Sequence, residues 1–165
     1  MKTLLLIRHA KSDWHSDAGS DFDRPLNDRG KHDAPVMARR LLTRKIAIDA
    51  FVSSPARRAR KTAAFFCREY DRDKSSIVFF EELYAAPESV FETVVKGLDD
   101  DWSTVALFSH NPGITDYANS LTTARIDNIP TCGIFAVRAQ TDHWADFTAA
   151  EKECWFVDYP KAGLD

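Results

Sequence analysis

Residues 3–9 read Thr-Leu-Leu-Leu-Ile-Arg-His, an aliphatic run that ends in a cation and an imidazole. Consecutive aliphatic residues predict a strand buried on both faces, as in parallel sheets. In open α/β sheets, ligands bind in the crevice beyond the carboxyl ends of the strands. We therefore expect Arg8 and His9 to lie on the floor of an active site, as a nucleophilic or phosphate-holding pair.

The composition is that of an ordinary soluble globular protein, with 44% hydrophobic and 28% charged residues among 165. This length predicts a single domain over residues 1–165. The net charge of −3 indicates no basic surface for nucleic acid or anionic membranes. The first apolar run is too short for a secretory signal, and no stretch is long enough to span a membrane, so we expect a cytoplasmic protein.

The three cysteines are odd in number and contain no CxxC pair. This pattern indicates neither a disulfide framework nor a zinc site. We expect Cys67, Cys132 and Cys154 to be reduced thiols in or near the core.

Alternating strand and helix patterns predict a three-layer α/β/α domain with a mostly parallel sheet and antiparallel additions. A long polar loop over 8–30 is expected to be functional if ordered. Ser54 and Pro55 are typical of an N-cap and a first helical position, and Asn111-Pro112 opens a later helix. The expected strands cover 3–7, 49–52, 77–80, 104–108, 133–138, 144–148 and 154–159, and helical spacing marks 34–42, 54–70, 90–98 and 111–121.

Three of the predicted strands are followed by arginine or histidine side chains. Arg8 and His9 follow the first, Arg58 lies just after the second, and His110 follows the strand at 104–108. Parallel strands place their carboxyl ends on one edge, so these side chains are expected to converge. Arginine matches phosphate oxygens with a planar fork, and a helix N-terminus adds free N–H groups. The pattern predicts a site for a phosphoryl group.

Neither a Walker motif nor HExxH occurs, and the remaining histidines have no ligand spacing, so we expect no metal and no cofactor. A neutral histidine can attack phosphorus without a metal. We expect His9 to be this nucleophile, with its other ring nitrogen donating to a backbone carbonyl. Arg8, Arg58 and His110 would hold the phosphoryl oxygens, since phosphoryl transfer depends mainly on positioning and electrostatics.

Four motifs in order resemble the histidine phosphatase superfamily, also called the phosphoglycerate mutase-like or RHG family. The family signature aligns with Arg8-His9-Ala10, followed by Ser12 and Trp14. The late G-H-x block aligns with Ser109-His110-Asn111-Pro112-Gly113. Two further segments, 23–30 (DRPLNDRG) and 54–63 (SPARRARKTA), match the family patterns, and the second alignment selects Arg58 rather than Arg57.

The resemblance is greatest to the compact SixA branch, which comprises phosphohistidine phosphatases. It implies a phosphoglycerate mutase-like fold without a helical lid, and a covalent phosphohistidine on His9 that water later releases. The family's proton-donating carboxylate would align with Ala85, and the nearby Glu81, Glu82 and Glu88 are out of register, so the identity of the general acid stays open. The imidazole of a phosphoramidate such as phosphohistidine leaves more easily than an alkoxide. This difference favours phosphohistidine in a protein as the substrate.

Two alternatives stay open from the sequence. The protein could hydrolyse a small phosphorylated molecule, or it could bind a phosphorylated ligand without catalysis. A mutase is disfavoured because it should keep the acid and a larger insertion. Ser12 and Asn111 are further candidates for substrate contact.

Overall fold

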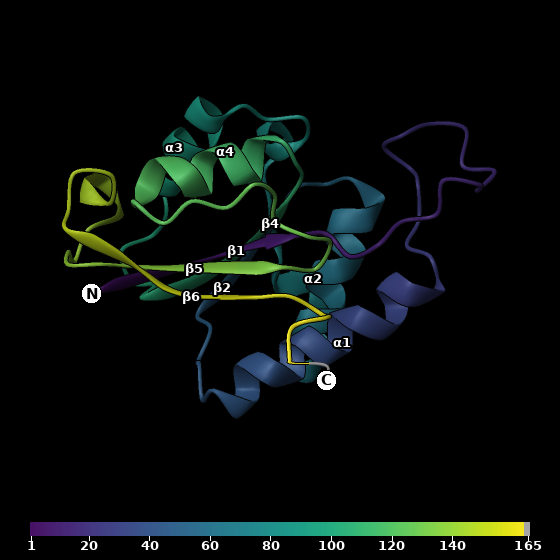
Figure 1. The fold of residues 1–165 in the computed structure, drawn as a ribbon, viewed down its shortest axis with the longest axis horizontal. Coiled ribbons are helices and arrows are strands. Elements are labelled where there is room, and N and C mark those ends of the chain that lie inside the picture. Colours follow the sequence, from purple (N-terminus) through teal and green to yellow (C-terminus); the bar gives the residue numbers. More distant parts are fainter. Residues whose placement is uncertain (164–165) are drawn as a thin grey trace.

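A six-stranded sheet in the order β3-β2-β4-β1-β5-β6 organises the chain (Figure 1). The computed structural model describes residues 1–163. The strands are β1 (Lys2–Arg8), β2 (Ala50–Ser53), β3 (Val78–Phe79), β4 (Thr104–Ser109), β5 (Ile134–Ala139) and β6 (Lys152–Asp158). Strands β3, β2, β4 and β1 run parallel, whereas β5 is antiparallel to both of its neighbours. This confirms the mostly parallel sheet with antiparallel additions.

Helices cover both faces of the sheet, which confirms the three-layer architecture (Figure 1). The alternating side chains of β1 show why, since Leu5 and Ile7 pack with α1 and α2, and Leu4 and Leu6 pack with α3 and α4. All four side chains are fully buried, as expected for a central parallel strand. The helices are α1 (Asp28–Thr43), α2 (Arg57–Glu69), α3 (Glu88–Lys96) and α4 (Gly113–Leu121), with 3₁₀ turns at η1 (Lys74–Ser76), η2 (Glu81–Leu83) and η3 (Trp144–Asp146).

The predicted strand at 144–148 is wrong, because this segment forms the 3₁₀ turn η3. Trp144 and Phe147 are three residues apart, which is one 3₁₀ turn, and both are fully buried with their rings stacked at 5.3 Å. The Trp144 indole N–H donates to the carbonyl of Trp102 at 2.8 Å. A strand would have sent these two aromatic side chains to opposite faces.

The predicted start of α2 is also wrong, because the helix begins at Arg57 with Ala56 as its N-cap residue. Ser54 is not a cap, since its hydroxyl lies against the ring of His110 instead. At the fourth helix, Pro112 occupies the N-cap position of α4, and Asn111 precedes it. Ser54 and Asn111 therefore both lie in the loops beyond the strand ends, outside the helices.

The loop after β1 is shorter than predicted. Its last residues, from Asp28 onward, belong to α1, because the side chain of Asn27 caps this helix by accepting the Gly30 N–H at 2.9 Å. The remaining element boundaries differ from the predictions by one or two residues. Within residues 1–163, the helices are all too short or too polar to cross a bilayer.

Candidate active site

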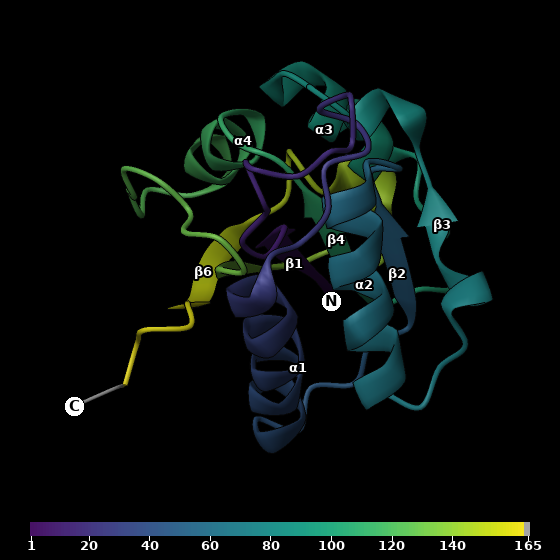
Figure 2. The same cartoon turned by 90° about the vertical axis from the view of Figure 1, so that its right-hand side faces the viewer.

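The predicted site residues do lie together at the carboxyl edge of the sheet. Figure 2 faces this edge, and the loop after β1 passes between α2 and α4. A pocket of about 370 Å³ opens here. It is lined by Arg8, His9, Lys11, Ser12, Trp14, Asp21, Arg24, Arg58, His110, Asn111 and Thr131, which include all six residues selected from the sequence.

His9 lies just beyond the end of β1 and is 6% exposed. Its Nδ1 is 2.7 Å from the carbonyl oxygen of Ala10. Burial, the neighbouring His110 and the two arginines lower the pKa of His9 to about 3, so its ring is neutral at neutral pH. Since a carbonyl can only accept, the proton is on Nδ1, and Nε2 keeps a lone pair, as a nucleophile requires.

His110 lies beside His9, with ring centroids 5.2 Å apart. Burial, followed by the charge of Arg58, lowers the pKa of His110 to about 3. Its Nε2 is 2.7 Å from the hydroxyl of Ser54, which also accepts the Ala56 N–H. Among residues 1–163 this hydroxyl has no other acceptor, and we infer that it donates to Nε2. This assignment places the proton of the neutral ring on Nδ1.

Arg8 and Arg58 are held by the backbone and by a carboxylate. Arg8 donates from Nη1 to the Ile129 carbonyl at 3.1 Å, and Arg58 donates to the carbonyl and the carboxylate of Asp21 at 2.7 and 3.0 Å. Burial and the charge of Arg58 lower the pKa of Arg8. Thr62 joins the two segments, because its hydroxyl accepts the Ala10 N–H and donates to the Arg58 carbonyl. Two guanidinium groups are thus kept close together in a fixed arrangement.

Sequence reasoning missed Asp21 and Tyr84 in this site, and it left Arg24 as a loop residue that could contact substrate. Asp21 accepts hydrogen bonds from Tyr84 at 2.7 Å, from Arg24 at 2.9 Å and from Arg58. The Tyr84 hydroxyl, followed by the arginines, holds the pKa of Asp21 well below its usual range. Arg24 is 8% exposed and lies under the Trp14 ring at 3.5 Å. A signal was available, because Asp21 and Arg24 have the spacing of an i,i+3 pair.

Ser12 and Asn111 line the pocket, and their polar groups are hydrogen-bonded to other residues of the protein. Ser12 accepts a hydrogen bond from Arg24. The Asn111 amide donates to the Ile129 carbonyl at 3.1 Å, and its oxygen accepts from Thr115 at 2.6 Å. Both side chains therefore have protein partners and position neighbouring groups around the pocket.

Four buried nitrogen atoms around this pocket have no hydrogen-bond partner. They are Nε of Arg8, Arg24 and Arg58, and Nδ1 of His110. An unpartnered buried polar group costs about 1–3 kcal/mol, and more when it is charged. All four residues line one pocket, which brings three guanidinium groups and two imidazoles together. Such a cationic lining fits an anion with several acceptor oxygens.

Within the described chain, the carboxylates around the pocket include none that is protonated and could act as the proton donor. Ala85 has a positive φ of 56° and contributes no side chain to the pocket lining. Of the described residues, Asp21 is the one carboxylate that lines it, and its low pKa keeps it ionised. No group of three or more His, Cys, Asp or Glu side chains within residues 1–163 is arranged to hold a metal ion.

Cys67 and Cys132 are buried thiols, and Cys154 is partly buried. All three are free, as expected for reduced thiols. Burial raises the pKa of Cys67 to about 11, and burial also raises the pKa of Cys132. Of the aromatic residues near the end of the chain, Trp144 is fully buried, Trp155 and Phe156 are partly buried, and Tyr159 is 40% exposed.

Comparisons with known proteins place this geometry in a family. A family model described as the histidine phosphatase superfamily (branch 1) matches residues 4–84. An uncharacterized protein of Mycobacterium tuberculosis is 32% identical over 151 residues, which cover 85% of this chain and 90% of that protein. An uncharacterized chloroplastic protein of Arabidopsis thaliana is 28% identical over 153 residues, or 88% of this chain and 70% of that protein.

Two solved structures that match over nearly the whole chain are assigned as the phosphohistidine phosphatase SixA. The one from Nakamurella multipartitia has a TM-score of 0.83 at 25% identity, covering 98% of this chain and 97% of its own. The one from Agrobacterium tumefaciens has a TM-score of 0.80 at 25% identity, covering 96% and 98%. The chain therefore belongs to the histidine phosphatase superfamily, in its SixA-type branch, and is a phosphatase with the phosphoglycerate mutase-like fold and no lid insertion.

Proposed function

We propose that this phosphatase removes the phosphoryl group from phosphohistidine in a protein, through a covalent phosphohistidine on His9. The observation that carries the proposal is the neutral imidazole of His9 in one pocket with His110 and three guanidinium groups. A phosphoryl group is an anion whose oxygens such a lining would bind. Arg8, Arg58 and His110 would bind it, and Arg24 joins them as a fourth donor.

The reaction would proceed in two displacements. The lone pair on His9 Nε2 attacks phosphorus, the bond from phosphorus to the substrate nitrogen breaks, and the departing imidazole keeps the electron pair and takes a proton from water. A second water then attacks phosphorus and gives a proton to the hydroxide left by the first step, the bond to His9 breaks with its electron pair returning to Nε2, and inorganic phosphate leaves. The fixed donors would stabilise the charge that develops on the oxygens in both steps.

The absence of an acid supports a phosphoramidate substrate over an alkyl phosphate. Asp21 is held ionised by Tyr84, Arg24 and Arg58, and Ala85 has no proton to give. An alkoxide leaving group needs a proton from such an acid, whereas imidazole departs with less help. The two neighbours assigned as SixA, at 25% identity, support the same substrate class.

We propose further that the reaction needs no metal and no cofactor, because the cationic side chains already supply the charge that a metal would. A panel of a phosphohistidine protein, an aryl phosphate, an alkyl phosphate and a sugar phosphate tests the substrate. The phosphohistidine protein should react fastest, with or without EDTA. Faster turnover of the alkyl or sugar phosphate would replace this proposal by a small-molecule phosphoester hydrolase.

The covalent step has its own test. Acid-labile phosphate should appear on His9 after rapid quenching, and His9→Ala should lower turnover of an aryl phosphate to background. Detecting neither labelled His9 nor turnover would instead favour a module that binds phosphorylated ligands. Retained activity of His9→Ala would show that another group is the nucleophile.

A further inference from the structure

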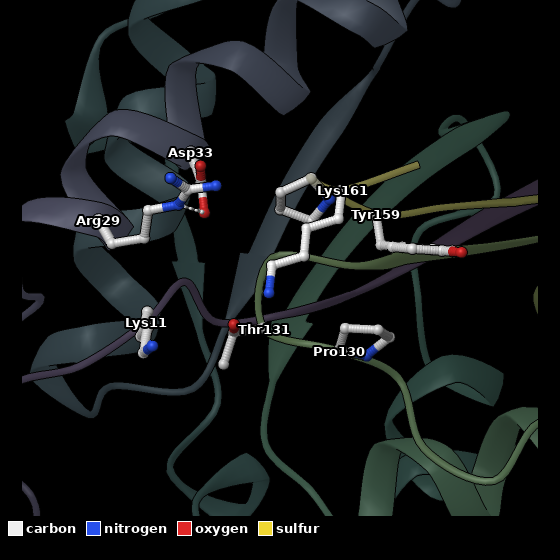
Figure 3. A pocket seen from close by; sticks show the side chains of 8 residues that line it. Lys11, Arg29, Asp33, Pro130, Thr131, Tyr159 and Lys161 are labelled. Atoms are coloured by element: carbon white, nitrogen blue, oxygen red, sulfur yellow. Dashed lines mark hydrogen bonds and ion pairs between the residues drawn. The ribbon is translucent and has the colours of Figure 1, made fainter. Parts of the chain in front are cut away.

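A second, larger pocket of about 510 Å³ adjoins the candidate active site. Figure 3 shows its side chains around a common opening, with the amines of Lys11 and Lys161 on its border. They come from the loop after β1, from α1, from the segment before β5 and from the chain after β6. The lining residues are Lys11, Arg29, Asp33, Pro130, Thr131, Tyr159, Pro160 and Lys161.

The two pockets have a common wall. Lys11 and Thr131 line both of them. Lys11 is two residues beyond His9, and Cys132, next to Thr131, donates its backbone N–H to the His9 carbonyl at 3.0 Å. The second pocket therefore borders the site of the candidate nucleophile, on the side of Lys11 and Thr131.

This common wall is rigidly placed against α1. The Lys11 carbonyl accepts the Asn27 N–H at 3.0 Å. Gly30 lets the helix approach this closely, because a Cβ at this position would be 2.2 Å from the same carbonyl oxygen. The backbone of Lys11, which borders both pockets, is thus packed on the first turn of α1, and their relative position is defined by the fold.

The charge in the second pocket is positive. It contains Lys11, Arg29 and Lys161 but only one carboxylate, Asp33. Asp33 is buried and pairs with Arg29 at 3.2 Å, which leaves two cations in excess. Two prolines and the Tyr159 ring give the remaining wall an apolar character. The lining fits an organic group that carries a negative charge.

We propose that this pocket is a subsite for a second anionic group, a carboxylate or a phosphate, on the part of the substrate that leaves. The inference rests on the proposed function, because it requires the scissile phosphoryl group to be on His9. The anion could belong to a small molecule or to an acidic side chain near a phosphohistidine. Both sources present the same chemistry to Lys11, Arg29 and Lys161.

The test compares substrates that differ in one charge. One arm uses 4-carboxyphenyl phosphate against 4-carbamoylphenyl phosphate, and the other uses phosphohistidine peptides with Asp or Asn near the modified residue. For each variant we take the ratio of kcat/KM between the anionic and the neutral substrate of a pair. Comparing this ratio between a variant and the wild type cancels the intrinsic reactivity of the leaving groups. Lys161→Gln should lower the anionic-to-neutral ratio about two- to fivefold in at least one arm, as for a partly exposed ion pair.

Two further variants sharpen this result. Lys161→Arg should keep the wild-type ratio, because it retains the charge. Lys31→Gln removes an exposed lysine on α1 that lines neither pocket, and it should also leave the ratio unchanged. A change confined to the peptide arm would identify a protein side chain as the anion, and a change confined to the aryl arm would identify a small molecule.

An unchanged ratio in both arms for Lys161→Gln, with wild-type turnover retained, would overturn the subsite and leave the proposed function standing. An equal fall for Lys31→Gln would also overturn it, since the effect would then be general electrostatics. If the wild type hydrolysed none of the four substrates, the proposed function would fail, and the subsite with it.

Discussion

The two neutral histidines of the pocket carry the proton on the same nitrogen, Nδ1, but the protein engages a different ring nitrogen in each. A backbone carbonyl holds the proton of His9 on Nδ1, and the Ser54 hydroxyl leaves the proton of His110 on Nδ1 by donating to Nε2. His9 therefore presents a lone pair toward phosphorus, whereas His110 presents a donor toward an oxygen. The same residue type serves two purposes because its hydrogen-bond partners differ.

Arg24 should matter as much as Arg8 and Arg58. Arg24→Gln removes one of the three guanidinium groups that line the pocket, and we expect kcat/KM for an aryl phosphate to fall on the order of 10²–10³-fold. Arg57→Gln is the matched control, since this half-buried arginine lines no part of the pocket. Steady-state kinetics of both variants check the expectation, and equal rates for the two would contradict it.

Ser54 should act through His110 as a positioning residue. Ser54→Ala frees Nε2 to take the proton, so Nδ1 is no longer a constant donor, and we expect kcat to fall about 5- to 30-fold with KM nearly unchanged. Ser53→Ala is the control, because this equally buried serine donates to the Ser54 carbonyl and does not contact His110. Similar losses in kcat for both variants would assign the effect to packing.

At the scale of elements, the site depends on how closely α1 packs against the loop after β1. Gly30 is the contact point, and its hydrogen in place of a Cβ allows the Lys11 carbonyl to approach. Asn27 reinforces the contact, because its side chain caps α1 while its backbone N–H binds the Lys11 carbonyl. The loop that carries Ser12, Asp21 and Arg24 is therefore anchored at its end.

Gly30→Ala should destabilise the fold by about 1–3 kcal/mol, because the backbone carbonyl at 2.2 Å must move to admit a methyl group. Activity should fall as well, since Lys11 borders the pocket. Gly97→Ala is the control, because its nearest neighbour, the Thr93 carbonyl, is at an ordinary 3.6 Å. Urea unfolding of the two variants measures the difference, and a Gly30→Ala protein as stable as Gly97→Ala would disprove the argument.

At the scale of the whole molecule, bringing three strand ends together places two imidazoles and three guanidinium groups in one buried region. The cationic surroundings and the burial both disfavour a charge on the histidines, so their pKa values fall to about 3. Asp21 is the carboxylate that compensates part of this charge within the pocket lining. The site is thus a source of pH-dependent stability.

Acidification should destabilise the protein through His9 and His110. Because their pKa values are lower in the folded state, the unfolded chain takes up protons first as the pH falls below about 6.5, and stability declines toward pH 3. Each histidine should contribute a loss on the order of 2 kcal/mol between pH 7 and 5. Urea unfolding at both pH values should therefore show a smaller loss for His110→Asn than for the wild type.

His143→Gln is the control for this linkage. This exposed histidine pairs with Asp100, which raises its pKa, so its contribution has the opposite sign. The acid-induced loss in this variant should be no smaller than in the wild type. If His110→Asn lost as much stability on acidification as the wild type, the neutral buried imidazole would be the wrong description.

Much of the fold could be read from local pattern. The aliphatic runs at 3–7 and 104–108 predicted the two central strands, since burial on both faces leaves no room for polar residues. The convergence of Arg8, His9, Arg58 and His110 followed from the parallel order, because such strands end on one edge. Where two structures suited the same residues, as at 144–148, the pattern predicted a strand and the packing of Trp144 and Phe147 produced a 3₁₀ turn.

Linear order contained little information about the polar contacts made across long separations in the chain. Asp21 meets Arg58 and Tyr84, 37 and 63 residues away, and Ser54 meets His110 across 56 residues. Hydrophobic periodicity encodes which face of a segment is buried, but the partner of a buried donor depends on which segments the fold brings alongside. For that reason the strands and the four expected site residues were accessible from the chain, whereas the Asp21 network, the tautomer of His110 and the second pocket exist only in three dimensions.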